Sequence, residues 1–190
     1  NLITDSLPAL SLGIDKEEPD IMNEPPRNPN DSLFKGSVVN LTLNGILIGL
    51  LSISAFILGG AIHSNEIAHS LQHFDISGVI SGFDNLNNTS NIYYPQTMAF
   101  IVLSVSQLVH SFDLRSDKKS IFQIGFFSNK YLIFSLLIGV LIQVIITIIP
   151  FLASTFKVVN LTMEDWLLVT IFSITPLIIN EIVKLFKRNK

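Results

Sequence analysis

Four stretches of this sequence are almost free of charged residues, and each is long enough to cross a membrane as a helix. They cover residues 36–62, 85–109, 131–156 and 166–183, and only the last contains a charge, Glu181. A helix needs about 20 residues to cross a hydrocarbon core of ~30 Å. The chain is therefore predicted to be an all-α membrane protein.

The composition supports this prediction and excludes other classes. Charged residues make up 14% of the 190 residues, whereas a soluble domain usually has about 25%. The mean hydropathy is +0.52. The absence of cysteine argues against a disulfide-stapled secreted fold. With 12 Lys and Arg against 15 Asp and Glu, the sequence also lacks the basic excess of a nucleic-acid binder, so no nucleic-acid partner is expected.

The expected architecture is a bundle of four full transmembrane helices plus the end of a fifth, ligand-bearing helix. The boundaries follow from the apolar runs and the polar segments between them. Helices are expected at 1–14, 38–62, 94–112, 131–153 and 166–183, and the segments between and after them are 15–37, 63–93, 113–130, 154–165 and 184–190.

The basic residues predict the orientation of these spans. Lys and Arg in short loops tend to remain on the cytoplasmic side of a membrane. Every Lys and Arg except Lys157 lies in 15–37, 113–130 or 184–190. These segments, and with them the C-terminus, are predicted to be cytoplasmic, and 63–93 and 154–165 extracytoplasmic.

Two of the connecting segments have a distinct character. Residues 15–31 are acidic and rich in proline, which predicts a loop without regular structure. Residues 63–91 are polar and rich in Ser, Asn and Gly, and we expect them to be the most flexible part.

Two weaker patterns also occur in the sequence. The Gly45–Gly49 pair indicates close helix packing. The extracytoplasmic histidines 63, 69 and 73 are more typical of loop positions than of a metal site.

The segment with the most chemical information is Asn1-Leu2-Ile3-Thr4-Asp5-Ser6-Leu7-Pro8. A carboxylate inside a spanning helix is costly and indicates a functional site. Asn1, Thr4 and Asp5 have the spacing i, i+3, i+4, which places their oxygens on one helical face. Pro8 removes the donor that would bond the Thr4 carbonyl, so we expect a locally opened helix with a free oxygen. Such oxygens suit a hard cation such as Ca²⁺, although a polar helix end near the interface explains the pattern equally well.

This run, with Leu12-Gly13 and Asp20-Ile21-Met22 after it, resembles the sixth transmembrane helix of type II P-type ATPases and the loop that follows. The resemblance continues along the whole chain. It includes the motifs Pro25-Pro26-Arg27-Asn28-Pro29, Thr97-Met98-Ala99-Phe100, Ser120-Ile121-Phe122, Gly125, Asn129-Lys130, Trp166, Pro176 and Glu181. The four spans would then be helices seven to ten, in a family whose C-terminus is cytoplasmic.

The resemblance implies a specific cargo and a ligand set. Asn1, Thr4 and Asp5 occupy ligand positions of calcium pumps, and an amide at Asn1 favours Ca²⁺ over Na⁺. Ser6 replaces a frequent glycine, so any unwinding would rest on Pro8. Gln107 is a weaker candidate, because it stands where two-site calcium pumps have a glutamate, and its single neutral oxygen favours one Ca²⁺ per cycle.

The same resemblance implies what the chain needs from elsewhere. It would be the C-terminal membrane portion of a P-type calcium-transporting ATPase, a translocase that exports Ca²⁺ from the cytosol. Its partners would be the lipid bilayer and the rest of the pump, namely helices one to five and the cytoplasmic domains that bind ATP and Mg²⁺. The fragment alone lacks the phosphorylation and nucleotide-binding domains.

Two alternatives remain open from the sequence. One is the same pump family with another cation, Mn²⁺ or Na⁺, and the other is a non-enzymatic membrane scaffold or a secondary carrier. The composition, with abundant Ile, Asn and Lys, indicates a multi-pass protein of a bacterial plasma membrane. The start at Asn1 is interpreted as the start of a fragment inside a helix.

Overall fold

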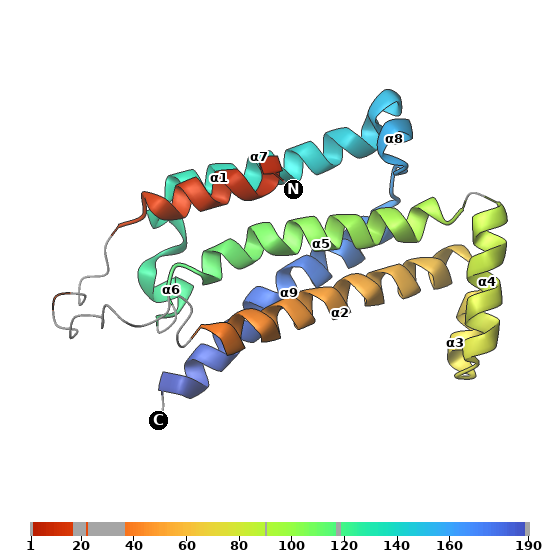
Figure 1. Cartoon of the computed structure of the whole chain (residues 1–190), viewed down its shortest axis with the longest axis horizontal. Coiled ribbons are helices and arrows are strands. Elements are labelled where there is room, and N and C mark those ends of the chain that lie inside the picture. The colour runs from red at the N-terminus through yellow and green to blue at the C-terminus, as the bar shows by residue number, and fades with distance from the viewer. Residues whose placement is uncertain (1, 17–21, 23–36, 90, 117–118, 189–190) are drawn as a thin grey trace.

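The computed structural model describes residues 2–16, 22, 37–89, 91–116 and 119–188, and this part of the chain is all-α. Five helices run lengthwise through the molecule (Figure 1). They are α1 (Leu2–Gly13), α2 (Val38–His63), α5 (Tyr93–Asp113), α7 (Lys130–Ile148) and α9 (Met163–Arg188). The predicted all-α fold class is confirmed. Asn1 and the prolines between residues 19 and 29 lie outside the described residues.

Helix α5 is the centre of the bundle. It packs against α2 and α9 on one side and against α7 and α1 on the other (Figure 1). The core between α2, α5 and α9 contains Ala55, Met98, Ile101, Val102 and Val169. Because every other long helix touches α5, this helix fixes the relative positions of the rest.

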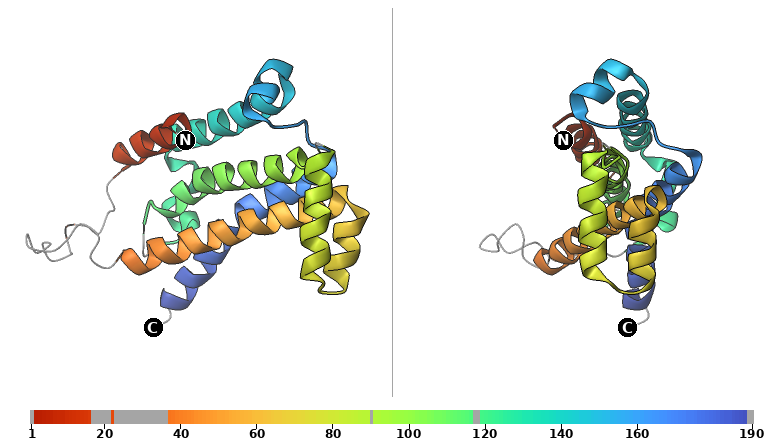
Figure 2. Two further views of the ribbon diagram at one scale, coloured as in Figure 1. Left: turned by 45° about the vertical axis from the view of Figure 1, so that its right-hand side comes forward. Right: turned by 90° about the vertical axis from the view of Figure 1, so that its right-hand side faces the viewer.

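The two ends of the bundle differ. At one end, α3 (Asn65–Gln72) and α4 (Ile76–Asn88) form a helical hairpin across the long helices (Figure 2); we call this the hairpin end. At the other end lie the short helix α6 (Ile121–Ile124) and the 3-10 turn η2 (Phe126–Ser128). We call it the basic end, because Arg115, Lys130 and Lys184 lie there.

Three helices of the described chain, α2, α7 and α9, are long and apolar enough to cross a membrane. Helix α5 has 21 residues but is more polar, and it reaches this standard only together with α4, to which it is bent by 103°. The count is therefore three or four spanning segments, against four full spans expected from the sequence.

Two segments differ from their expected structure. The polar segment 63–93 contains the two helices α3 and α4, because Ile67, Leu71, Val79, Phe83 and Leu86 lie at helical spacing and form a small core. Its Ser, Asn and Gly content hid this periodicity.

The helix expected at 131–153 ends at Ile148, and α8 (Pro150–Phe156) follows in a new direction (Figure 1). Ile149 is extended, with φ −78° and ψ 115°. Proline disfavours helical backbone at the residue before it and cannot donate a hydrogen bond, so Pro150 starts a separate helix.

Close packing of α5 and α7 depends on Gly139. A Cβ atom there would lie 2.4 Å from Leu108 Cδ1, whereas a Cβ at Gly45 or Gly49 would have no atom of the described residues within 4 Å. The glycines that bring helices together are therefore not the Gly45–Gly49 pair singled out from the sequence.

We predict that Gly139→Leu lowers the free energy of unfolding by about 1–3 kcal/mol, because it overfills the α5–α7 contact. The matched variant Gly49→Leu should leave stability nearly unchanged. Thermal unfolding of the two variants in detergent tests this, and equal melting temperatures would contradict the assignment of Gly139 to a tight contact.

Candidate functional site

Helix α1 carries Asp5, the carboxylate singled out from the sequence. One side of α1 packs against α7 and α5, and Pro8 and Ser11 are buried there. Asp5 and Ser6 are exposed, and so is Leu10, which is 69% exposed. The helix therefore has one covered side and one uncovered side, and Asp5 lies on the uncovered side.

Pro8 does not break α1. The helix is continuous from Leu2 to Gly13 with Pro8 inside it, so the expected local opening is not observed. Proline still lacks the N–H that would bond the carbonyl of Thr4. That carbonyl oxygen has lost its usual helical donor and is an acceptor within one turn of Asp5.

The described residues do not by themselves complete a metal site. Asn1 lies outside them, and Thr4 is described only as part of the α1 backbone. Gln107 is exposed on α5, the helix beside α1. Within the described ranges, no group of three or more His, Asp or Glu side chains could hold a metal ion.

The three histidines also do not form one site. The rings of His69 and His73 lie 4.5 Å apart on the hairpin. His63 points elsewhere: its Nε2 lies 3.2 Å from Oδ1 of the fully buried Asp165, and Tyr94 stacks on its ring at 4.0 Å. His63 thus connects α2 to the start of α9, which supports a structural role.

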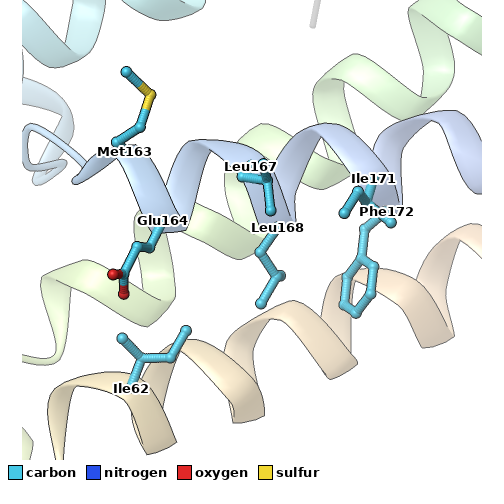
Figure 3. A pocket seen from close by; sticks show the side chains of 7 residues that line it. All are labelled: Ile62, Met163, Glu164, Leu167, Leu168, Ile171 and Phe172. Carbon is cyan, nitrogen blue, oxygen red and sulfur yellow. The ribbon is translucent and has the colours of Figure 1, made fainter.

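A cavity of about 420 Å³ lies between the end of α2 and the start of α9 (Figure 3). Its lining is apolar except for Glu164. The lining residues are Ile62, Met163, Glu164, Leu167, Leu168, Ile171 and Phe172. One carboxylate in an apolar surround provides too few oxygens for a hard cation, so this cavity is a poor ion site.

A buried polar cluster at the basic end was not found from the sequence. Lys184 Nζ lies 2.6 Å from Asp113 Oδ1 and donates to the Asp113 carbonyl at 3.1 Å. Glu181, one turn before Lys184, accepts hydrogen bonds from the Ile121 N–H at 3.0 Å and from the Ser120 hydroxyl. The cluster joins α5, α9 and α6. The available signal was Glu181 and Lys184 at i, i+3 near the end of an apolar span.

The cluster continues deeper into the bundle through two amides. Asn180 Nδ2 donates to Asn44 Oδ1 at 2.7 Å and lies 3.5 Å from His110 Nδ1. Asn44 and Asn180 are both buried. Amide pairs of this kind hold helices together in apolar surroundings, so α2 is joined to the same network.

A second cluster fixes the end of α1. The Arg115 guanidinium donates to both Asp15 carboxylate oxygens, at 2.6 and 3.2 Å, to the Gly125 carbonyl at 3.0 Å and to the Ser128 hydroxyl at 2.7 Å. Asn129 Nδ2 donates to the Ser11 carbonyl at 2.9 Å. The end of α1 is thereby attached to the segment between α5 and α7.

Asp15 is electrostatically stabilised in this cluster. Partial burial by itself raises the pKa of the Asp15 carboxyl. The hydrogen bonds from Arg115 and from the Lys16 backbone, with the Arg115 charge, outweigh burial, so the net pKa lies below its ordinary value of 3.8.

The fold and these clusters define an all-α bundle of apolar helices that are held together by buried polar pairs, with Asp5 on the uncovered side of α1. Residues 1–186 match the family model described as "Cation transporting ATPase, C-terminus". The chain belongs to this family, and the resemblance noted in the sequence is confirmed.

Relatives with curated descriptions agree with this assignment. The chain is 53% identical to calcium-transporting ATPase 1 of Bacillus cereus, over 100% of this chain and 20% of the relative. It is 34% identical to a calcium-transporting ATPase of Bacillus subtilis, over 93% of this chain and 17% of the relative. A calcium-transporting ATPase of Listeria monocytogenes is 28% identical, over 97% of this chain and 18% of the relative. The chain thus spans about a fifth of the length of these relatives.

We predict that Lys184→Met lowers the free energy of unfolding by about 3–5 kcal/mol, because it leaves the Asp113 carboxylate buried without its partner. The double variant Asp113→Asn/Lys184→Met should recover much of this loss. Lys130→Met, at an exposed position, is the control. Additive effects of the two substitutions in thermal unfolding would contradict the pairing.

The Asp15–Arg115 pair predicts a pH dependence of stability. A carboxyl whose folded pKa is lowered stabilises the folded state above its ordinary pKa, and this contribution is lost as the pH falls through the folded value. Asp15→Asn should therefore cost about 1 kcal/mol at neutral pH. The difference from the parent should shrink as the pH falls below 3.8.

The free energy of unfolding, measured at pH values from about 7 down to about 3, tests this dependence, because this range includes the ordinary pKa of a carboxyl group. Asp84→Asn, at an exposed position on α4, is the control and should show no such trend. A difference for Asp15→Asn that stays constant into acid would show that the carboxylate charge is not what stabilises this end of α1.

Proposed function

We propose that this chain is the C-terminal membrane portion of an ATP-driven pump that exports Ca²⁺ from the cytosol, a P-type ATPase, and that it contributes part of the transmembrane ion site. The family match over residues 1–186 carries the proposal. The named relatives, which are calcium-transporting ATPases, support Ca²⁺ as the cargo.

In this proposal the ion ligands of the chain are Thr4 and Asp5 of α1, together with Asn1, which precedes this helix in the sequence. Asp5 supplies an anionic oxygen, and Asn1 and Thr4 supply neutral ones. The Thr4 carbonyl is available because Pro8 cannot donate to it. Ca²⁺ takes six to eight oxygens, so the other ligands come from the rest of the pump, which faces the uncovered side of α1.

Gln107 is the remaining candidate ligand. It is exposed on the helix beside α1. An amide offers one neutral oxygen where a carboxylate would offer two anionic ones, so we assign it a weaker contribution and one Ca²⁺ per cycle.

The same proposal places the chain in a bacterial plasma membrane as a multi-pass protein, with the basic end in the cytoplasm. Lys and Arg gather at that end, as they do in cytoplasmic loops. The partners are then the lipid bilayer and the rest of the pump. ATP and Mg²⁺ act in cytoplasmic domains, which phosphorylate an aspartate outside these residues and so drive the movement of the ion-binding helices.

We predict that Asp5→Asn in the full-length pump lowers the apparent Ca²⁺ affinity by at least about 10–100-fold. Removal of a group that only supports a metal ligand already has an effect of this size, and Asp5 is proposed to bind the ion directly. Gln107→Ala should lower it less. Asp84→Asn, a carboxylate at the opposite end of the bundle, should leave it unchanged. ATP hydrolysis measured at graded free Ca²⁺ gives these values.

The same titration distinguishes the cargo. If Mn²⁺ or Na⁺ stimulates ATP hydrolysis by the parent pump and micromolar Ca²⁺ does not, the family assignment stands but the proposed cargo is wrong. Mn²⁺ and Na⁺ also bind oxygen ligands, so the donor atoms of α1 alone do not distinguish them from Ca²⁺.

A further inference from the structure

The α3–α4 hairpin crosses α2 close to its end. The ring of Phe83 on α4 stacks on Phe56 of α2, with centroids 4.8 Å apart. A Cβ at Gly60 would lie 2.6 Å from Phe83, so the contact needs a glycine at this position. Since α2 ends at His63, a rise of 1.5 Å per residue places the crossing about 5–10 Å inside that end.

One face of α4 continues beyond this contact and is apolar. Ile76, Ile80 and Phe83 are spaced i, i+4, i+7, which places them on one side of the helix. Phe83 is partly buried against Phe56 of α2, whereas Ile76 is 75% exposed and Ile80 is 59% exposed. The face that packs on α2 thus extends outward, away from the bundle, without a protein cover in the described structure.

Phe74, at the tip of the hairpin, has an unusual position. It follows α3 with φ 55°, a left-handed conformation that favours glycine at the end of a helix. Its side chain is 94% exposed. A large aromatic ring here is unfavourable for the local backbone and gains almost nothing from contacts within the described chain, so a contact outside the chain accounts for it.

The opposite side of the hairpin is polar. Glu66 accepts hydrogen bonds from Asn85 at 2.8 Å and from Ser81 at 3.4 Å. Ser77 is exposed and lies on the same stripe as Ser81 and Asn85. The hairpin therefore has a polar side and an apolar face, and the exposed part of this apolar face is separate from the residues that form its small core.

We propose that the α3–α4 hairpin lies in the interface of the outer leaflet and inserts Phe74, Ile76 and Ile80 between the lipids. This inference rests on the proposed function, which places α2 across a membrane with its hairpin end outside. Interfacial helices bury their apolar face about 5–10 Å into the boundary between headgroups and acyl chains, the depth at which the hairpin crosses α2.

The sequence of the hairpin also indicates which lipids it needs. Residues 65–88 contain no Lys or Arg. Attraction to anionic headgroups therefore cannot hold the hairpin on the membrane, and apolar insertion must do so. A zwitterionic lipid such as phosphatidylcholine is sufficient.

The test places an environment-sensitive NBD label at single cysteines in the full-length pump, with cysteines elsewhere in the pump removed; this chain contributes none. The labelled variants are Phe74→Cys, Ile76→Cys and Ile80→Cys, with Ser77→Cys as the matched control on the polar stripe. The pump is reconstituted in phosphatidylcholine vesicles. Quenching is measured with nitroxide lipids labelled near the headgroup end of the acyl chain and with aqueous iodide.

We expect labels at 74, 76 and 80 to be quenched by the nitroxide lipid and protected from iodide, and the label at 77 to show the reverse. Added anionic lipid should not change this pattern. Equal access of iodide to all four labels overturns the proposal. Protection from iodide without quenching by lipid also overturns it, because the cover would then be protein, either the rest of the pump or a second copy.

A separate readout distinguishes failure of the proposed function. Retention of the pump in vesicles after carbonate extraction, together with Ca²⁺-stimulated ATP hydrolysis, reports on the membrane assignment and not on the hairpin. Loss of both overturns the proposed function and this inference with it. Retention and activity with an iodide-accessible hairpin overturn only the inference.

Discussion

The structure depends on pairing polar groups inside helices that are otherwise apolar. An unpaired charge or amide is costly where water is absent, and at the basic end the bundle pairs several buried ones. Lys184 neutralises Asp113, Glu181 accepts hydrogen bonds from the start of α6, and Asn180 bonds Asn44. These contacts come from α2, α5, α6 and α9, so one connected network fixes both the helix positions and the loop between α5 and α7.

This network has a direct consequence for α1. The loop that it fixes also supplies Asn129, which bonds the Ser11 carbonyl, and Gly125 and Ser128, which hold Arg115 against Asp15. Helix α1 is therefore attached firmly at its end, while the side that carries Asp5 is uncovered. In the proposed pump, this arrangement joins the ligand helix to α5 and α7 at the basic end and leaves Asp5 accessible to the ion and to the ligands of the other helices.

Helices α2, α7 and α9 could be predicted from the sequence because each contains an apolar run about as long as a membrane crossing. The end of α7 could not, since Pro150 interrupts a run whose apolar composition continues unchanged. The hairpin was missed for the opposite reason: its Ser, Asn and Gly content conceals five apolar residues at helical spacing. Asp5 could be recognised as a candidate ligand from its local sequence. The Asp113–Lys184 pair could not, because its two members are 71 residues apart.

Burial separates the two roles that polar residues take in this chain. Asp113, Asn180 and Glu181 are buried and have partners, so their cost is offset within the bundle and their role is structural. Asp5 and Gln107 also lie on apolar helices but are exposed, and neither belongs to the two clusters described above. In the proposed pump, Asp5 lies at membrane depth and therefore needs a partner from outside these residues. A bound cation with ligands from neighbouring helices meets that need in this proposal, whereas the buried pairs of α5 and α9 stabilise the bundle.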